Sequence, residues 1–183
     1  MDDSQLSGDL THVLYTAEQV EQRIRELAAQ IDVDYADKDL LLVGVLNGAV
    51  MVMADLSRAL TIHCQMDWMA VTSYGSGTKS SGVVRILKDL STDITDVHVL
   101  VVEDIIDTGL TLSYLVSNLR SRRPASLKIM TAFRKPDAAQ NRVEVSYVGF
   151  DIPNEFVVGY GLDYNGKYRN LTSVCTLSPH IYK

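Results

Sequence analysis

The sequence predicts an α/β protein with a central, mostly parallel sheet flanked by helices. A short continuous apolar run, typical of a strand covered on both faces, occupies residues 40–46, and a second run, rich in β-branched residues, occupies 97–102. Residues 127–133 and 143–150 are predicted to form two further strands. Segments with apolar residues at helical spacing follow the first two runs. Strands that alternate with helices form βαβ units with right-handed crossovers, and such sheets bind ligands at the carboxyl ends of their strands. A chain of 183 residues without internal repeats or a long linker fits one domain.

Local signals define the elements in chain order. We expect residues 1–12 to form a flexible N-terminus and residues 13–183 to form the single domain. A capping box opens the first helix at Thr16 and Gln19, and the apolar face of that helix comprises Val20, Ile24, Leu27 and Ala28. The strand at 40–46 ends at a turn, and the helix after it has its apolar residues at Val50, Met51, Ala54, Leu56 and Leu60. The run 97–102 precedes a third helix, which is marked by Leu112, Leu115, Val116 and Leu119.

Composition and charge exclude several classes of protein. The chain carries 17 Lys and Arg against 23 Asp and Glu, a net charge of -6, which argues against binding of nucleic acid through a basic face. No apolar run approaches the length of a membrane span, and the polar, acidic N-terminus is unlike a signal peptide. Cys64 and Cys175 lack Cys-x-x-Cys spacing, so we expect reduced thiols in or near the core. These features favour a cytoplasmic protein that binds a small molecule and no membrane.

The segment 101–111 carries the most informative motif. A buried strand ends in Glu103 and Asp104, Asp107 follows, and a helix opens at Thr108-Gly109-Leu110-Thr111. A turn of small residues lets backbone N–H groups approach an anion at a helix N-terminus, and the threonine hydroxyls add donors. Two carboxylates at a strand end suit the diol of a ribose, so the motif predicts a site for ribose-5-phosphate. A single acidic residue here would more often be a helix cap, but the full combination is more specific.

This segment resembles the phosphoribosyl-pyrophosphate signature of the type I phosphoribosyltransferases. The resemblance covers nearly everything from residue 12 onward, in the order seen in hypoxanthine-guanine phosphoribosyltransferases: the region 40–60, Ser73-Tyr74, the signature, Arg134-Lys135-Pro136 and the region 153–169. The stretch DIPNEFVVGYGLDY at 151–164 separates this family from the adenine and orotate enzymes. The resemblance implies a type I phosphoribosyltransferase fold, in which a small hood built from terminal segments lies over the base site.

The same resemblance implies an activity in purine salvage. Hypoxanthine or guanine would react with phosphoribosyl pyrophosphate to give IMP or GMP and pyrophosphate, with Mg²⁺ bridging ribose hydroxyls and pyrophosphate. Asp107 is the expected general base at N7 of the purine, and it would act partly by electrostatic stabilisation because an exposed aspartate is a weak base. The carboxylates expected at the metal are Glu103, Asp104 and Asp163. Relatives assemble, so we expect a homo-oligomer, either a dimer or a tetramer.

Other residues take their expected roles from the resemblance. Phosphoribosyl pyrophosphate is expected to contact Glu103, Asp104, Asp107, Thr108, Gly109, Leu110, Thr111, Asn47, Gly48 and Arg169. The 6-oxopurine is expected to contact Lys135, Phe156, Val157 and Asp163, with Lys135 donating to O6. A non-proline cis peptide is expected between positions 46 and 47. Many relatives carry Lys or Arg at position 47 and some carry Lys at position 110, so backbone amides are the expected pyrophosphate donors beside Asn47.

Residues 73–83 have two interpretations. The Gly- and Ser-rich composition of this stretch is explained by a flexible linker, whereas the resemblance implies a lid with Ser73 and Tyr74 at its leading edge. A lid makes chemical sense because water would capture an oxocarbenium-like transition state in an open site. A Walker A loop is excluded, since Thr78 separates Gly77 from Lys79.

Two other classes of function compete with transfer. A regulatory relative that keeps the phosphoribosyl-pyrophosphate pocket but acts on nucleic acid is disfavoured by the pI of about 5.1 and the short polar N-terminus. A nucleotide-binding module of the flavodoxin-like or Rossmann type is disfavoured because the chain has no Gly-x-Gly-x-x-Gly motif. Outside the resemblance, Lys135, Asp163 and Arg169 would pass as surface charges and the run 156–158 as a core strand.

Overall fold

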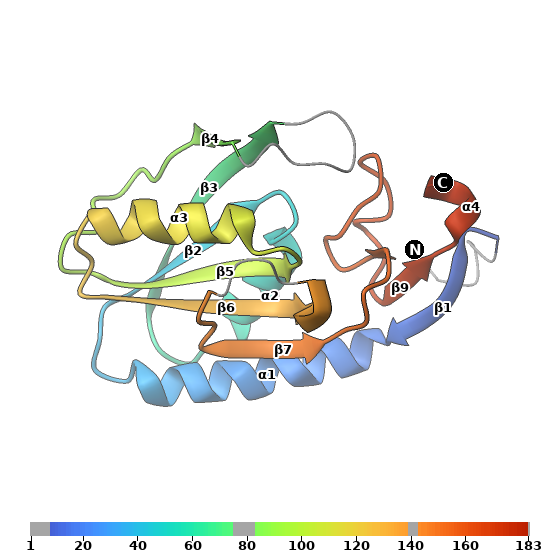
Figure 1. Ribbon diagram of the computed structural model, residues 1–183. Coiled ribbons are helices and arrows are strands. Elements are labelled where there is room, and N and C mark those ends of the chain that lie inside the picture. Colours follow the sequence, from blue (N-terminus) through green and yellow to red (C-terminus); the bar gives the residue numbers. More distant parts are fainter. Residues whose placement is uncertain (1–7, 75–82, 139–142, 183) are drawn as a thin grey trace.

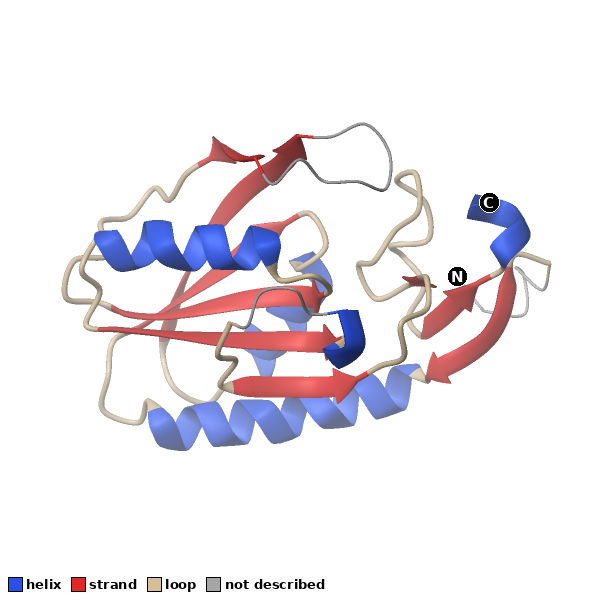
Figure 2. Ribbon diagram, viewed as in Figure 1, coloured by secondary structure: helices blue, strands red, loops and turns tan. Residues whose placement is uncertain are grey.

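The computed structural model describes residues 8–74, 83–138 and 143–182, and within them the chain forms two sheets (Figure 1, Figure 2). The larger sheet has six strands in the order β4-β3-β2-β5-β6-β7. They are β2 (Leu40–Leu46), β3 (Cys64–Tyr74), β4 (Val83–Lys88), β5 (His98–Ile106), β6 (Ser126–Arg134) and β7 (Tyr147–Asp151). Every pair is parallel except β3 with β4 at the edge, which is antiparallel. The predicted mostly parallel α/β fold is confirmed.

The predicted strands correspond to β2, β5, β6 and β7, with differences at their ends. β5 continues to Ile106 instead of ending at residue 102, because Glu103 and Ile105 keep pairing with β6. β7 begins at Tyr147, later than the predicted start at 143. β3 was not indicated by the sequence, since polar residues such as Asp67 interrupt its apolar positions. Glu103 and Asp104 of the signature motif therefore lie within β5, whereas Asp107 lies in the turn directly after it.

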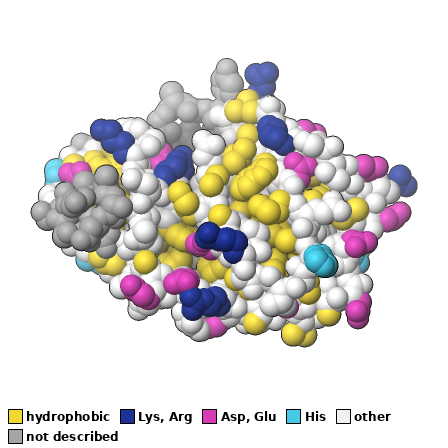
Figure 3. Space-filling model, turned by 180° about the vertical axis from the view of Figure 1, so that it is seen from behind, with side chains coloured by type: hydrophobic (Ala, Val, Ile, Leu, Met, Phe, Trp, Pro, Cys, Tyr) yellow, Lys and Arg dark blue, Asp and Glu magenta, His cyan; other side chains and the backbone are white. Residues whose placement is uncertain are grey.

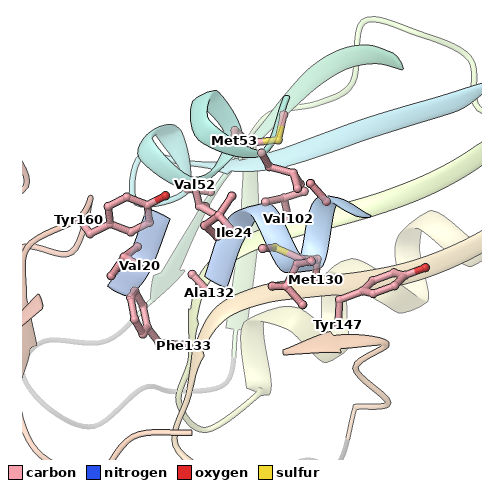
Figure 4. Packing of buried hydrophobic residues seen from close by; sticks show 14 of the residues in the cluster. Val20, Ile24, Val52, Met53, Val102, Met130, Ala132, Phe133, Tyr147 and Tyr160 are labelled. Carbon is pink, nitrogen blue, oxygen red and sulfur yellow. The ribbon is translucent and has the colours of Figure 1, made fainter. Parts of the chain in front are cut away.

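Helices α1 (Ala17–Asp34) and α2 (Val50–Ala59) cover one face of the larger sheet, and α3 (Leu110–Ser121) covers the other (Figure 1). The predicted capping box of α1 is present, with Thr16 and Gln19 each accepting a hydrogen bond from the backbone N–H of the other. Strand residues alternate between the faces, so Val102 packs under α1 and α2 whereas Val101 packs under α3. Figure 4 shows the first of these two cores.

A three-stranded antiparallel sheet, the hood, is built from both ends of the chain. Its strands are β1 (Leu10–Tyr15), β9 (Val174–Leu177) and β8 (Val157–Val158), and the short helix α4 (Pro179–Tyr182) follows β9. The hood lies beyond the carboxyl ends of the parallel strands (Figure 1). A hood made of terminal segments is therefore present, as the resemblance implies. Because β1 begins at Leu10, the flexible N-terminus predicted for 1–12 overlaps a paired strand; residues 1–7 lie outside the described residues.

The carboxyl ends of the parallel strands bring the predicted site segments to one edge of the sheet. The loop 47–49 follows β2, the turn 107–109 follows β5, and Lys135 follows β6 just before a 3₁₀ turn at Pro136–Ala138. Parallel strands all end at the same edge, so residues that are distant in the chain become neighbours there. This edge faces the hood (Figure 1).

Candidate active site

The side chains of Glu103 and Asp104 line two different cavities, because neighbouring residues of a strand point to opposite faces of the sheet. Glu103 lines a cavity together with Val45 and the turn that leads into α3. Asp104 lines a second cavity together with Lys135. Its carboxylate packs against the loop after β2, where a Cβ placed on Gly48 would lie 1.6 Å from Asp104 Oδ2. The structure thus divides two carboxylates that the sequence places side by side.

The turn between β5 and α3 forms the wall of the first cavity. This cavity has a volume of about 220 Å³ and is lined by Val45, Glu103, Ile105, Ile106, Asp107, Thr108, Gly109, Leu110, Thr111 and Leu112. Gly109 precedes α3 with a φ of 76°, and none of the described side chains caps that helix. The first N–H groups of α3 remain available at this cavity, where the helix dipole favours an anion. The turn can therefore hold a phosphate group by backbone amides and the hydroxyls of Thr108 and Thr111.

The second cavity lies between the sheet edge and the hood. It has a volume of about 230 Å³ and is lined by Asp104, Ile105, Asp107, Lys135, Phe156, Val157, Leu162 and Asp163. Lys135 Nζ lies 3.4 Å from Asp107 Oδ2; the lysine side chain is 9% exposed and the aspartate side chain 52% exposed. The ring of Phe156 stacks on that of Tyr182, with 5.0 Å between centroids. An aromatic ring, a buried ammonium group and an accessible carboxylate line one space, which suits a flat polar heterocycle.

The loop after β2 is closely packed against both Asp104 and the segment that follows β8. The Leu46–Asn47 peptide bond is cis, as the resemblance implies. A Cβ on Gly161 would lie 2.1 Å from the carbonyl oxygen of Gly48. Side chains at Gly48 and Gly161 would therefore clash, and only glycine lets the two backbones approach this closely.

Arg169 and Asp163 form an ion pair beside Asp104. Arg169 Nη2 lies 2.7 Å from Asp163 Oδ1, and Arg169 Nη1 donates to the carbonyl oxygen of Gly161 at 2.6 Å. Asp163 also accepts a hydrogen bond from the N–H of Gly166 at 2.7 Å. Next to the larger effect of burial, Arg169 lowers and Asp163 raises the pKa of Asp104, so both charges act on that carboxylate. The structure thus brings together three predicted site residues from β5 and from the segment after β8.

Burial dominates the electrostatics of the two β5 carboxylates. Burial, followed by repulsion from Asp104, raises the pKa of Glu103 well above its ordinary value. Burial also raises the pKa of Asp104 to about 6, against the opposing hydrogen bond from the N–H of Ile105. Each negative charge is costly unless a cation or a hydrogen-bond donor lies beside it.

The carboxylates of Glu103, Asp104 and Asp163 are oxygen donors of the kind that Mg²⁺ binds. Carboxylate oxygens are ligands that Mg²⁺ prefers, and proteins often supply only one or two of them while substrate phosphates and waters complete the shell. Over residues 8–74, 83–138 and 143–182, no three Asp, Glu, His or Cys side chains are grouped to hold a metal ion. Asp104 and Asp163, which line the same cavity, therefore suit an ion shared with a phosphorylated ligand, whereas the buried Glu103 lies on the other side of β5.

The two predicted lid residues lie outside the two cavities, and two residues that were not predicted line the second cavity. Ser73 and Tyr74 are the last residues of β3 and pair with β4, and the rest of the predicted lid, 75–82, lies outside the described residues. Ile105 and Leu162 line the second cavity although the sequence analysis did not select them. The signal that would have found them is their position, since each adjoins a selected aspartate, Asp104 or Asp163.

A larger cavity of about 550 Å³ lies between α1, α2 and the segment 169–172. It is lined by Ala17, Glu21, Ile24, Arg25, Met51, Asp55, Arg58, Ala59, Tyr160, Arg169, Asn170, Leu171 and Thr172. Of the predicted site residues with described side chains, only Arg169 lines it. Size is a weaker guide than chemistry here, so we place the site at the two smaller cavities, where carboxylates, Lys135 and a helix N-terminus converge.

Comparison with known proteins agrees with this geometry. Residues 12–165 match the family model of the phosphoribosyl transferase domain. The hypoxanthine-guanine phosphoribosyltransferase of Mycobacterium tuberculosis is 56% identical over 182 residues, which cover 96% of this chain and 90% of the relative. That of Streptococcus thermophilus is 48% identical over 177 residues, covering 97% and 98%. A crystal structure of a hypoxanthine phosphoribosyltransferase from Staphylococcus aureus matches with a TM-score of 0.95 at 44% identity, covering 100% of both chains. The chain belongs to the phosphoribosyltransferase family and, within it, to the hypoxanthine-guanine phosphoribosyltransferases.

Proposed function

We propose that the protein transfers the 5-phosphoribosyl group of phosphoribosyl pyrophosphate to hypoxanthine or guanine, giving IMP or GMP and pyrophosphate in purine salvage. The observation that carries this proposal is the second cavity, where Lys135, Asp107 and Phe156 line one space. That space adjoins the first cavity, because Ile105 and Asp107 line both. A base site next to an anion site is what the joining of a purine to a sugar phosphate requires.

The sugar phosphate is assigned to the turn after β5. The 5-phosphate would accept hydrogen bonds from the backbone amides of Thr108, Gly109, Leu110 and Thr111 and from the two hydroxyls. Leu110 would contribute its backbone alone, so the absence of a lysine at this position leaves the phosphate cradle intact. A site of this kind needs no basic side chain, which suits a chain with a net charge of -6.

The ribose and the pyrophosphate are assigned to the β5 carboxylates and to the loop after β2. Glu103 and Asp104 would accept hydrogen bonds from the ribose hydroxyls from two sides of the strand. The backbone amides of Asn47 and Gly48, together with the guanidinium group of Arg169, would bind the pyrophosphate. The contact of Gly48 with Asp104 supports this assignment, since it places the loop directly beside the proposed ribose site.

The purine is assigned to the second cavity. Lys135 would donate to O6, a contact that the amino group of adenine cannot accept, and Phe156 would stack on the ring. The backbone of Val157 would bind the base edge near Asp163. As the bond from C1 to pyrophosphate breaks and the base nitrogen attacks, Asp107 would stabilise the positive charge that develops and receive the proton from N7.

We propose Mg²⁺ as the cofactor, held by Glu103, Asp104 and Asp163 together with the substrate. When bound, the ion would neutralise charge on the departing pyrophosphate. The position of Asp104 beside the Asp163–Arg169 pair and the burial of Glu103 in the same strand support this placement. The chain's own part is to hold these oxygens in fixed positions before the substrate arrives.

We also propose that the protein is a cytoplasmic homo-oligomer, a dimer or a tetramer, that acts on small molecules without nucleic acid or membrane. Hydrophobic side chains gather across the middle of the face seen in Figure 3, and such patches favour protein partners. Cys64 and Cys175 are both thiols. In the described part of the chain, no helix is long and apolar enough to cross a membrane. Light scattering coupled to gel filtration would test the oligomer, and a monomer would contradict it.

A spectrophotometric assay tests the proposed activity. The protein, phosphoribosyl pyrophosphate and Mg²⁺ are combined in turn with hypoxanthine, guanine, xanthine and adenine. We expect IMP from hypoxanthine, GMP from guanine and no product from adenine. Absence of product from every 6-oxopurine would contradict the proposal. In that case, a salt-sensitive gel shift with RNA or DNA would favour the regulatory alternative.

A further inference from the structure

Tyr160 connects the segment after β8 to the core beneath the sheet. Its side chain is buried, and its ring meets that of Phe133 of β6 edge-on, with 6.3 Å between centroids. Its hydroxyl donates to Asp55 Oδ2 of α2 at 2.8 Å. Figure 4 shows the ring at the edge of the core cluster, beside Val20. One side chain therefore contacts both a helix and a strand of the main sheet.

The backbone around Tyr160 is held in an unusual conformation. Gly159, Tyr160 and Gly161 have φ values of 97°, 49° and 96°. The N–H of Tyr160 donates to the carbonyl of Leu171 at 2.9 Å, and the N–H of Gly161 donates to that of Arg169 at 3.0 Å. A non-glycine residue adopts the left-handed region only at a cost, so the surrounding contacts must hold Tyr160 there. The buried phenol ring supplies such contacts.

The same segment reaches the loop that we assign to pyrophosphate. Gly161 lies against the carbonyl oxygen of Gly48 and also accepts the hydrogen bond from Arg169 Nη1. Asp55, the partner of the Tyr160 hydroxyl, lies in α2, which begins at Val50 directly after that loop. The bond between Tyr160 and Asp55 therefore ties together the two segments that supply the proposed pyrophosphate contacts.

The charges around this bond keep Tyr160 a donor. Burial, followed by the Asp55 carboxylate, raises the pKa of Tyr160 far above its ordinary value, so the phenol stays protonated. The other oxygen of Asp55 pairs with Arg58, whose side chain is 76% exposed. Oδ2 is thus left for Tyr160, and the carboxylate is shared between an exposed cation and a buried hydroxyl.

We propose that Tyr160 is a positioning residue, whose hydrogen bond to Asp55 holds Arg169 and Gly161 against the pyrophosphate loop. This inference rests on the proposed function and adds a residue that touches no substrate. It assigns Tyr160 its main effect at the pyrophosphate end of the site, since Lys135 and Phe156 at the base end are held by other contacts.

The test compares Tyr160→Phe with a matched control. Tyr160→Phe removes the hydroxyl and keeps the ring; we expect KM for phosphoribosyl pyrophosphate, and for pyrophosphate in the reverse reaction, to rise about fivefold to tenfold. KM for hypoxanthine and kcat should change by less than about twofold, because the base contacts are untouched. Tyr147→Phe is the control, since the Tyr147 hydroxyl also donates to an aspartate, Asp34, at the end of α1. It should lower Tm without changing either KM.

Two results would overturn the inference. One is an unchanged KM for phosphoribosyl pyrophosphate in a folded Tyr160→Phe variant. The other is a fall in kcat together with a rise in KM for both substrates, accompanied by a loss of Tm like that of Tyr147→Phe. If Tyr160→Phe does not fold, Asp55→Ala and Asp55→Asn replace it. Asparagine keeps an oxygen that accepts from the phenol, so only Asp55→Ala should raise KM for phosphoribosyl pyrophosphate. Equal KM values in the two variants would refute the role. Absence of transferase activity in the unmodified protein would instead contradict the proposed function.

Discussion

Lys135 Nζ and Asp107 Oδ2 lie 3.4 Å apart, joining the residue after β6 to the turn after β5. The lysine is buried, whereas the side chain of Asp107 is 52% exposed, so the pair presents a donor and an acceptor side by side at the second cavity. A 6-oxopurine protonated at N7 presents the complementary pattern, an acceptor at O6 next to a donor at N7. We therefore propose that this pair selects 6-oxopurines.

Replacement of Asp107 by Asn should separate chemistry from binding. Asparagine keeps the size of the side chain but lacks the charge and the basicity, so kcat should fall about 100-fold or more while KM for phosphoribosyl pyrophosphate changes by less than about threefold. Steady-state kinetics with both substrates would measure this. Asp37→Asn, at an exposed turn residue after α1, should leave both constants unchanged. Equal losses in kcat and in affinity would contradict the role of Asp107.

Replacement of Lys135 by Met should weaken recognition of the 6-oxo group. A hydrogen bond to a charged group contributes about 1.5–3 kcal/mol, so KM for hypoxanthine should rise about tenfold or more. KM for phosphoribosyl pyrophosphate should change little in the same variant. Lys38→Met, at an exposed lysine after α1, is the matched control. An unchanged KM for hypoxanthine in Lys135→Met would remove this lysine from the base site.

Removal of Mg²⁺ with EDTA should abolish the transferase activity, and Asp163→Asn should raise the Mg²⁺ concentration needed for half-maximal rate by about tenfold. The reason is that Asp163 lies near Asp104, in the same cavity, and is one of the oxygen donors we assign to the ion. A titration of rate against free Mg²⁺ measures the shift. If Asp163→Asn and the Asp37→Asn control titrate alike, Asp163 does not contribute to the metal site.

Asp67 should make stability depend on pH. It is buried in β3 and accepts hydrogen bonds from the N–H groups of Trp68, Ser91 and Thr92 and from Lys88 Nζ. Burial alone raises the pKa of Asp67, but these hydrogen bonds together outweigh burial, so the pKa lies below its ordinary value. The carboxylate therefore stabilises the fold fully above the unfolded-state pKa of about 3.9, and this contribution is lost as the pH falls through the lower folded-state pKa.

Asp67→Asn should consequently lower the free energy of unfolding by about 1–3 kcal/mol at pH 7. The difference from the unmodified protein should shrink below about pH 4, as the wild-type carboxylate becomes protonated. Urea denaturation followed by circular dichroism at pH 7 and at pH 3 would measure both values. A difference that stays constant or grows in acid would show that the hydrogen bonds of Asp67 do not depend on its charge.

Much of the fold could be predicted because a buried parallel strand is recognisable from a short local stretch rich in apolar residues. The run that forms β2 is continuous and apolar, the stretches that form β5, β6 and β7 are rich in apolar residues, and the capping box of α1 needs only Thr16 and Gln19. β3 could not be predicted because Asp67 interrupts its apolar residues. The carboxylate of Asp67 is stabilised by the N–H groups of Ser91 and Thr92, more than twenty residues further along the chain. β1 could not be predicted because it pairs with β9 at the other end of the chain, and a local sequence pattern contains no information on that pairing.

The sequence by itself determined the fold class and the identity of the signature residues, because the motif at 103–111 is contiguous and its chemistry is carried by residue type. Only the tertiary structure decided how those residues are arranged. Pairing with β6 extended β5 and sent Glu103 and Asp104 to different cavities. The approach of Gly161 to Gly48 and the bond between Tyr160 and Asp55 join segments more than a hundred residues apart. Such contacts depend on packing between elements, which no local spacing of residues encodes.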